Sequence, residues 1–396
     1  MQAEKSPFRW VVLALLLANI LIATLAMNCI PPLFKEIGMQ IPLTKAQMGT
    51  VMGALMLASL VVAPVGGAVS DRIGSRLGLG IAALIIAAGG MLRATAGSAT
   101  GLTVHMFFIG AGLAIFGPNM PKALGMWFPK KELGLANGLC LAAMGIGGAI
   151  AMATAASFMS PAFGGWRGTM VYVGAVNLVA AVLWLIFFRD RSAAGGGGET
   201  GSMAKNFRKV LGVRDIWLLS IFYGLNMAGI MTVVSLLPIS LAERGIERGG
   251  EMVGVMMGTA VIFNIAGGVF SDLTGRRKPF LIIGTVVLGL SVLLATQASG
   301  PVLVVALACA GAAMGTVGPL MMVIPIEIEE IGPKLTATAM GVIFMIGNAG
   351  GFAGPVVSGR IMDYTGSNIS GFMLMAALLI IAAGFIFPLR ETGKKK

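Results

Sequence analysis

The sequence predicts an all-α integral membrane protein with twelve transmembrane helices in two pseudo-symmetric six-helix bundles. Only 11% of the 396 residues are charged and 57% are hydrophobic, whereas soluble domains carry about 25% charged residues. Such a chain cannot cover itself with polar surface. It instead contains apolar runs of about 20 residues, the length that a helix needs to cross a bilayer. A segment of the first half also recurs 201 positions later, which predicts two homologous halves.

The apolar runs are separated by short polar loops, and each run is interpreted as one membrane-spanning helix. The six runs of the first half are residues 10–30, 46–69, 77–96, 101–121, 133–158 and 168–188. The six runs of the second half are residues 216–238, 251–270, 279–297, 301–325, 336–357 and 370–388. The first run is too long for the core of a signal peptide and is followed by eleven more, so we interpret it as helix 1.

A polar, glycine-rich segment divides the two halves. It contains four consecutive glycines at residues 195–198, a composition typical of flexible linkers. We therefore predict an N-terminal six-helix bundle over residues 1–190, a cytoplasmic linker over 191–214, and a C-terminal six-helix bundle over 215–396. Every other loop is short, which leaves no room between the helices for a soluble catalytic domain.

The distribution of Lys and Arg predicts the orientation of the chain in the membrane. Of these 28 residues, 21 lie in the two tails and in the loops after helices 2, 4, 6, 8 and 10, and seven lie in the other loops. Because cytoplasmic segments are enriched in Lys and Arg, we expect both termini on the cytoplasmic side of the cell (inner) membrane of a bacterium or archaeon. Topology therefore explains the net charge of +12 without nucleic-acid binding, and residues 394–396 are expected to meet anionic lipid head groups.

The strongest internal repeat is an eleven-residue stretch at the end of the second run. Residues 66–76 and 267–277 are identical at six positions, namely two glycines, a serine, an aspartate, a third glycine and an arginine. The glycine pair permits close approach of a neighbouring helix. The aspartate, at a cytoplasmic helix end, is placed to face the positive N-terminal end of another helix. A solvated turn with cationic anchors is the alternative interpretation.

With Gly67, Asp71, Arg72, Gly74 and Arg76, this loop resembles the motif that follows helices 2 and 8 in the major facilitator superfamily of transporters. The resemblance covers essentially the whole chain and implies alternating access, in which two halves rock around a site near the membrane midplane. The resemblance implies a gating role for the residues that match the motif in the two halves: Gly67, Asp71, Arg72, Gly74, Arg76, Gly268, Asp272, Gly275, Arg276 and Arg277.

The connection between the fourth and fifth runs is similar to that of superfamily branches that carry oxalate, monocarboxylates and nitrate. It consists of Trp-Phe-Pro at residues 127–129, a charged turn, and Gly-x-Ala-x-Gly at residues 134–138. Glycine-rich segments at residues 138–148 and 341–351 resemble the fifth and eleventh helices of those carriers. The resemblance therefore implies a small anion as the substrate.

The residues available for chemistry exclude most other classes of protein. Asp and Glu occur only at the ends of the runs or in loops, so no central carboxylate is present for the proton coupling that a buried acid supports. A single histidine and three cysteines inside apolar runs provide neither a metal-ligand pattern nor a nucleophile–base set. We predict that the protein is not an enzyme and has no metal and no cofactor.

Polar side chains within the runs are the candidates for substrate binding. They are Thr24, Asn28, His105, Asn119, Lys122, Tyr223, Asn226, Asn264 and Asn348. Lys122 could hold the charge of an anion or extend to the membrane interface. His105 titrates near neutral pH and could relay a proton, or it is an interfacial residue. The amides and hydroxyls suit substrate binding and interhelical hydrogen bonds equally well, so both interpretations remain open.

Together these observations predict a secondary transporter that works by alternating access and moves a small metabolite, an organic anion such as a monocarboxylate, by symport or uniport. Ala63 and Asn264 stand where nitrate carriers have arginines, so nitrate itself is not expected. The alternative is a multidrug efflux transporter for hydrophobic compounds, because Met48, Met52 and Met56 suit an adaptable apolar wall. We expect a monomer whose partners are its small-molecule substrate and membrane lipids.

Overall fold

The computed structural model describes residues 7–190 and 203–393, apart from the side chains of residues 64–72, 130, 203–205 and 333–334. All regular structure in the described residues is helical. Among them, 12 helical segments are long and apolar enough to span a membrane, from Phe8–Gln40 to Asn368–Ile386. The predicted fold class, an all-α multi-pass membrane protein with twelve spans, is confirmed.

The chain forms two compact units. Unit 1 comprises Met1–Leu43 and Ala54–Gly197, and unit 2 comprises Thr44–Gly53 and Gly198–Lys396. We call the end of unit 1 that contains residue 190, and the end of unit 2 that contains residue 203, the linker ends. The opposite end of each unit is its far end. Because successive helices run in opposite directions, side chains from chain segments far apart in sequence meet at each of these ends.

The first half of the chain contains one helix that combines two predicted ones. The helices are α1 (Phe8–Asn28), α2 (Phe34–Gln40), α3 (Lys45–Leu92), α4 (Ala99–Trp127), α5 (Lys130–Thr154), α6 (Ser160–Ala162) and α7 (Trp166–Phe187). Within α3, Gly74 has a φ of 84° and a ψ of 168°, which is not helical. Glycine reaches positive φ without a steric penalty, so the second and third predicted helices meet at this glycine of the repeated loop.

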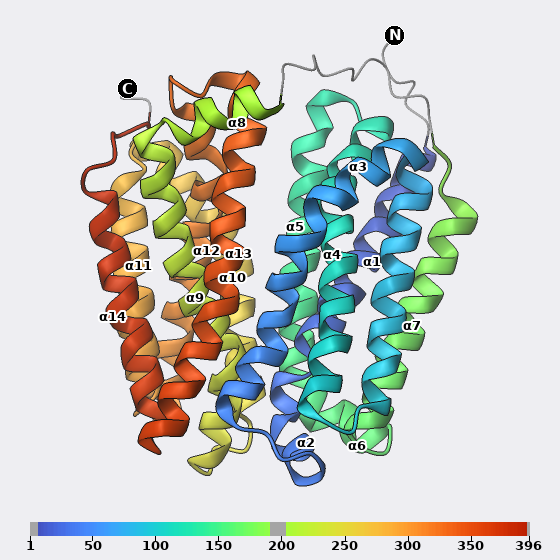
Figure 1. Cartoon of the computed structure of the whole chain (residues 1–396), viewed down its shortest axis with the longest axis vertical. Helices are drawn as coiled ribbons and strands as arrows, with labels where there is room; N and C mark the ends of the chain where they lie inside the picture. The colour runs from blue at the N-terminus through green and yellow to red at the C-terminus, as the bar shows by residue number, and fades with distance from the viewer. Residues whose placement is uncertain (1–6, 191–202, 394–396) are drawn as a thin grey trace. The chain divides into compact units, whose positions relative to one another are not determined.

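The second half begins with a short helix that the sequence analysis did not anticipate. The helices are α8 (Met203–Leu211), α9 (Arg214–Glu243), α10 (Gly249–Thr274), α11 (Lys278–Ala295), α12 (Gly300–Glu327), α13 (Gly332–Thr365) and α14 (Asn368–Ile386). Helix α8 lies across the linker end of unit 2, where α9 begins (Figure 1). Its Val210 side chain is fully buried in the core of unit 2, together with Ile216 and Leu389, which anchors the helix to the bundle.

In both units a glycine-rich helix crosses a neighbour at close range, α5 on α1 and α13 on α9. A methyl group on Gly147 would lie 3.0 Å from the carbonyl carbon of Leu21, and one on Gly350 would lie 2.7 Å from that of Gly224. Both distances are shorter than the 3.4 Å at which ordinary van der Waals contact begins. These two glycines lie 203 positions apart, and both serve the close packing of helices in a membrane.

Candidate functional site

The far end of unit 1 contains a fully buried arginine that the sequence analysis did not include among the site residues. Arg93 donates a hydrogen bond from Nη1 to the carbonyl oxygen of Ala26 at 2.9 Å and contacts the sulfur of Met106 at 3.5 Å. In the sequence, Asn28 is two residues from Ala26, and His105 is next to Met106. Among the described residues, Nε of Arg93, Oδ1 of Asn28 and Nδ1 of His105 have no hydrogen-bond partner. The structure therefore places a fully buried cation at this end of unit 1, and this residue could have been recognised in the sequence as a charge inside an apolar run.

The other candidates in unit 1 lie on α1 and α4. The Thr24 hydroxyl donates to the carbonyl oxygen of Ile20 at 2.9 Å, and the Asn119 amide donates to that of Ile115 at 2.7 Å. Both side chains are buried, and these bonds satisfy donors that would be costly to leave unpaired in a membrane. Lys122 follows Asn119 by three residues and is half-buried. Thr24 and Asn119 thus have intrahelical partners, whereas Lys122 contributes a charge near the linker end of α4.

The four candidate residues of unit 2 differ in whether their side chains form hydrogen bonds with neighbouring residues. Asn226 is buried, and its Oδ1 accepts a hydrogen bond from Thr285 of α11 at 3.3 Å. Asn226 therefore joins two helices. Tyr223, Asn264 and Asn348 are half-buried and make no side-chain hydrogen bond with any residue that the structure describes. The hydrogen-bonding groups of these three side chains are therefore not committed to another described residue.

The charged side chains that lie deepest in the described spans are cations. Every Asp and Glu of these spans lies within four residues of a span end. The three deepest are cations that lie five residues inside spans ending at Gln40, Trp127 and Thr365: Lys35, Lys122 and Arg360. Arg93 is nearer the end of its span but is fully buried. Because charges inside a membrane are costly and are usually functional, this arrangement favours a negatively charged ligand.

An ion-pair network occupies the linker end of unit 2. The Arg277 guanidinium lies 2.6 Å from Asp272 and 2.9 Å from Glu327, and the Thr392 hydroxyl donates to Glu327 at 2.8 Å. The hydrogen bond to Glu327 is the largest influence on the pKa of Arg277; together with Asp272 it raises this pKa above its ordinary value, against the lowering effect of burial. A permanently charged guanidinium therefore links the end of α10 to the end of α12.

The equivalent arginine of unit 1 has a different partner. Arg76 donates from Nε to the carbonyl oxygen of Leu185 at 2.9 Å. Met126 occupies the position that corresponds to Glu327 at the repeat offset of 201, so unit 1 has no carboxylate at this place. The same repeated loop therefore supports an ion-pair network in unit 2 and a hydrogen bond to the backbone in unit 1.

In each unit, one carboxylate caps the helical segment that follows the repeated loop. Asp190 accepts hydrogen bonds from the backbone amides of Ser75 at 3.0 Å and Arg76 at 3.1 Å. Glu391 accepts a hydrogen bond from the backbone amide of Arg277 at 2.6 Å. A carboxylate at a helix N-terminus satisfies free amides and interacts favourably with the helix dipole. Neither residue was among the predicted site residues, although the two are also separated by 201 positions.

The remaining predicted gating residues surround these contacts. Gly275 has a φ of 61° and ends α10, and a methyl group on Gly268 would meet nothing within 4 Å. The carbonyl oxygen of Arg276 accepts a hydrogen bond from Ser271 at 2.8 Å. Three further gating residues fall among those whose side chains lie outside the described part of the chain: Gly67, Asp71 and Arg72. A gating role for the repeated loop remains a prediction.

Comparison with known proteins identifies the family. The sequence profile of the Major Facilitator Superfamily matches residues 15–258 and 240–396. The chain belongs to the Major Facilitator Superfamily. The predicted resemblance to this superfamily is confirmed, and a solved structure of a related transporter has the same fold. A bacterial homologue of the human lysosomal transporter Spinster, solved in an inward-facing and unoccupied conformation, matches with a TM-score of 0.85 over 97% of both chains at 16% sequence identity.

Relatives of this superfamily member are named as anion transporters. The chain is 26% identical to the probable sulfoacetate transporter SauU of Cupriavidus necator, over 90% of this chain and 88% of that protein. It is 25% identical to the probable nitrate transporter NarT of Staphylococcus haemolyticus, over 92% of each chain. The family and these relatives identify the chain as a membrane transporter.

Proposed function

We propose that this superfamily member is a secondary transporter that carries a small organic anion, such as a monocarboxylate, by alternating access. The observation that carries this proposal is that the charged residues farthest from a span end in the described spans are cations, at five residues, whereas the acid farthest from an end, Glu36, lies at four. Relatives named for sulfoacetate and nitrate support an anion as the substrate. Ala63 and Asn264, in place of the arginines expected of a nitrate carrier, favour an organic anion over nitrate.

The proposal assigns different roles to the polar side chains. Lys122 supplies a positive charge to the bound anion as a compact ammonium group. Tyr223, Asn264 and Asn348 orient the substrate, because their hydrogen-bonding groups have no partner among the described residues. Asn226 instead holds α9 and α11 together through Thr285 and positions the neighbouring Tyr223.

The proposal also includes the orientation and the gate. Both termini lie in the cytoplasm of a bacterium, because the charge bias along the sequence places the linker ends there. The network of Arg277, Asp272 and Glu327 then lies on the cytoplasmic side, where it fixes the repeated loop at the end of α10, the predicted gating segment, against the end of α12. Accessibility of a cysteine added after Lys396 to a membrane-impermeant reagent in intact cells tests this orientation. Labelling in intact cells would contradict it.

The test of the binding role is uptake of radiolabelled monocarboxylates into proteoliposomes by the Lys122→Gln variant. A hydrogen bond to a charged group contributes about 1.5–3 kcal/mol, so KM is expected to rise about tenfold or more. Arg248→Gln is the matched control, since Arg248 is exposed and paired with Glu251 on the same helix turn, and its KM is expected to stay unchanged. An unchanged KM for Lys122→Gln would exclude a charge role, and transport of lipophilic cations instead of carboxylates would favour hydrophobic-compound efflux.

A further inference from the structure

The linker end of unit 2 presents an exposed basic and aromatic surface that the proposed transport function does not use. Helix α8 is anchored by the buried Val210, while Phe207, Arg208 and Lys209 on the same helix are exposed to solvent or lipid. Arg214, at the start of α9, is exposed as well. An amphipathic helix with basic and aromatic side chains on its free face is typical of the membrane–water interface.

The cations of this surface have no counter-charge in the described part of the protein. Arg208, Lys209 and Arg214 make no ion pair or hydrogen bond through their side chains with any described residue. The adjacent Asp215 is 9% exposed and lies within the first turn of α9. Three neighbouring positive charges without a carboxylate partner among the described residues favour the binding of an anionic group.

An apolar groove begins below Arg214, on the face of α9 that carries this side chain. Trp217 is 43% exposed, and its Nε1 donates to the carbonyl oxygen of Leu211 at 2.9 Å, which fixes the end of α8 against the start of α9. Ile221 and Leu225 follow Trp217 at steps of four residues, so the three side chains lie on one helical face. Trp217 thus stands between the cations and the groove, where tryptophan is enriched at membrane interfaces.

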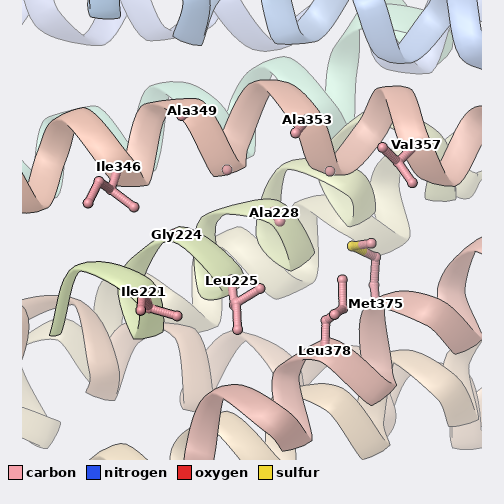
Figure 2. Close-up of a pocket in the computed structure, with 12 residues that line it drawn as sticks. Ile221, Gly224, Leu225, Ala228, Ile346, Ala349, Ala353, Val357, Met375 and Leu378 are labelled. Carbon is pink, nitrogen blue, oxygen red and sulfur yellow. The ribbon is translucent and has the colours of Figure 1, made fainter. Parts of the chain in front are cut away.

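The groove has a volume of about 400 Å³ and is lined only by apolar side chains and glycines of α9, α13 and α14. Figure 2 shows Ile221 and Leu225 of α9 opposite Met375 and Leu378 of α14. The lining residues of α13 extend from Ile346 to Val357, which corresponds to about 16 Å along the helix. This length is about half of the roughly 30 Å hydrocarbon core of a bilayer, and the α13 part of the groove begins 14 residues after Gly332, where α13 starts at the linker end.

We propose that unit 2 binds one anionic glycerophospholipid of the leaflet at its linker end. The head-group phosphate lies against Arg208, Lys209 and Arg214, Trp217 lies at the level of the glycerol backbone, and one acyl chain fills the apolar groove. Ile221 follows Arg214 by seven residues, about 10 Å along the helix, so the charged and apolar parts of a single lipid reach both regions. None of the residues that line the groove is among the proposed anion-binding residues, although Tyr223 and Asn348 are next to lining residues in the sequence.

The proposal is tested by quenching of Trp217 fluorescence with phospholipids brominated near the start of their acyl chains. The measurement uses a full-length variant in which Phe replaces the four other tryptophans, Trp10, Trp127, Trp166 and Trp184. Each Lys or Arg near a membrane surface contributes about a fivefold preference for anionic lipid. We therefore expect brominated phosphatidylglycerol to associate at least about fivefold more strongly than brominated phosphatidylcholine.

Two variants separate the parts of the site. Arg208→Gln/Lys209→Gln/Arg214→Gln is expected to abolish the preference for phosphatidylglycerol, whereas Arg360→Gln, at the far end of α13, is expected to keep it. Ala349→Leu/Ala353→Leu fills the groove with side chains and is expected to reduce quenching by either lipid.

The proposal would be overturned if the two lipids associated equally with the protein that keeps Arg208, Lys209 and Arg214. Unchanged quenching after the groove is filled would overturn it as well. Native mass spectrometry of the wild-type chain from mixed vesicles provides a second measurement that needs no tryptophan substitution. A retained phosphatidylglycerol that is absent from the triple glutamine variant supports the site, and retention of phosphatidylcholine in equal amount contradicts it.

Discussion

The close crossing of α13 on α9 leads to a sharp prediction about Gly350. Alanine at this position would place a methyl group 2.7 Å from the carbonyl carbon and 2.9 Å from the Cα of Gly224. The shorter distance falls 0.7 Å below the 3.4 Å of ordinary contact, and the atoms concerned are backbone, which cannot rotate away. Overpacking of this kind costs about 1–3 kcal/mol, so Gly350→Ala is expected to lower the stability of unit 2 by that amount.

Gly341 provides a matched control on the same helix. A methyl group on Gly341 would meet nothing within 4 Å, and replacing a helical glycine by alanine stabilises a helix by about 0.5–1 kcal/mol when no clash occurs. For a unit of this size, 1 kcal/mol shifts the melting temperature by about 2–4 °C. Thermal unfolding in detergent is therefore expected to show a lower Tm for Gly350→Ala and an unchanged or higher Tm for Gly341→Ala. Equal Tm values for the two variants would refute the close crossing.

Three other predictions concern the linker ends. Glu327→Gln is expected to lower stability by about 1.5–3 kcal/mol because it removes a charge-assisted hydrogen bond to Arg277. Glu330→Gln is expected to change stability by less than about 1 kcal/mol, since Glu330 pairs with Arg390 on an exposed surface. Denaturant titration compares the two variants, and equal losses of stability would contradict the network. Asp190→Ala and Glu391→Ala are each expected to cost about 0.5–2 kcal/mol as lost helix caps, measured by thermal unfolding, and an unchanged Tm in both would exclude capping. Because the caps lie in different units, the two losses are expected to add in the double variant, and a loss clearly different from the sum would show that the caps are coupled.

The fold class followed from the sequence because hydrophobicity constrains membrane proteins strongly. Helix is the structure that satisfies every backbone group within a long apolar segment, so run length alone predicted the twelve spans. Helix α8 was missed because it is a nine-residue amphipathic helix inside a polar segment, and its anchoring depends on Val210 contacting side chains that are distant in sequence. Residues from the end of the chain, such as Leu389, belong to the same core.

The candidate site was predictable in residue type and less so in role. A sequence shows that Asn226 and Asn264 are amides in apolar runs, but only the packing of α9 on α11 shows that Asn226 bonds to Thr285. Arg93 was noticeable as a charge in an apolar run, while its complete burial depends on contacts with α1 and α4. The cap at Asp190 depends on the place where α7 ends, which no local pattern specifies.

The central claim, carrier-mediated transport of a small organic anion, is tested most directly by a counterflow measurement. Proteoliposomes are preloaded with an unlabelled monocarboxylate, diluted into trace labelled monocarboxylate, and followed over time without imposed pH or voltage gradients. An alternating-access carrier predicts transient accumulation of label above its equilibrium level, which disappears when the vesicles are preloaded with a lipophilic cation instead. Label that enters at the same rate with or without preloaded anion would contradict the account.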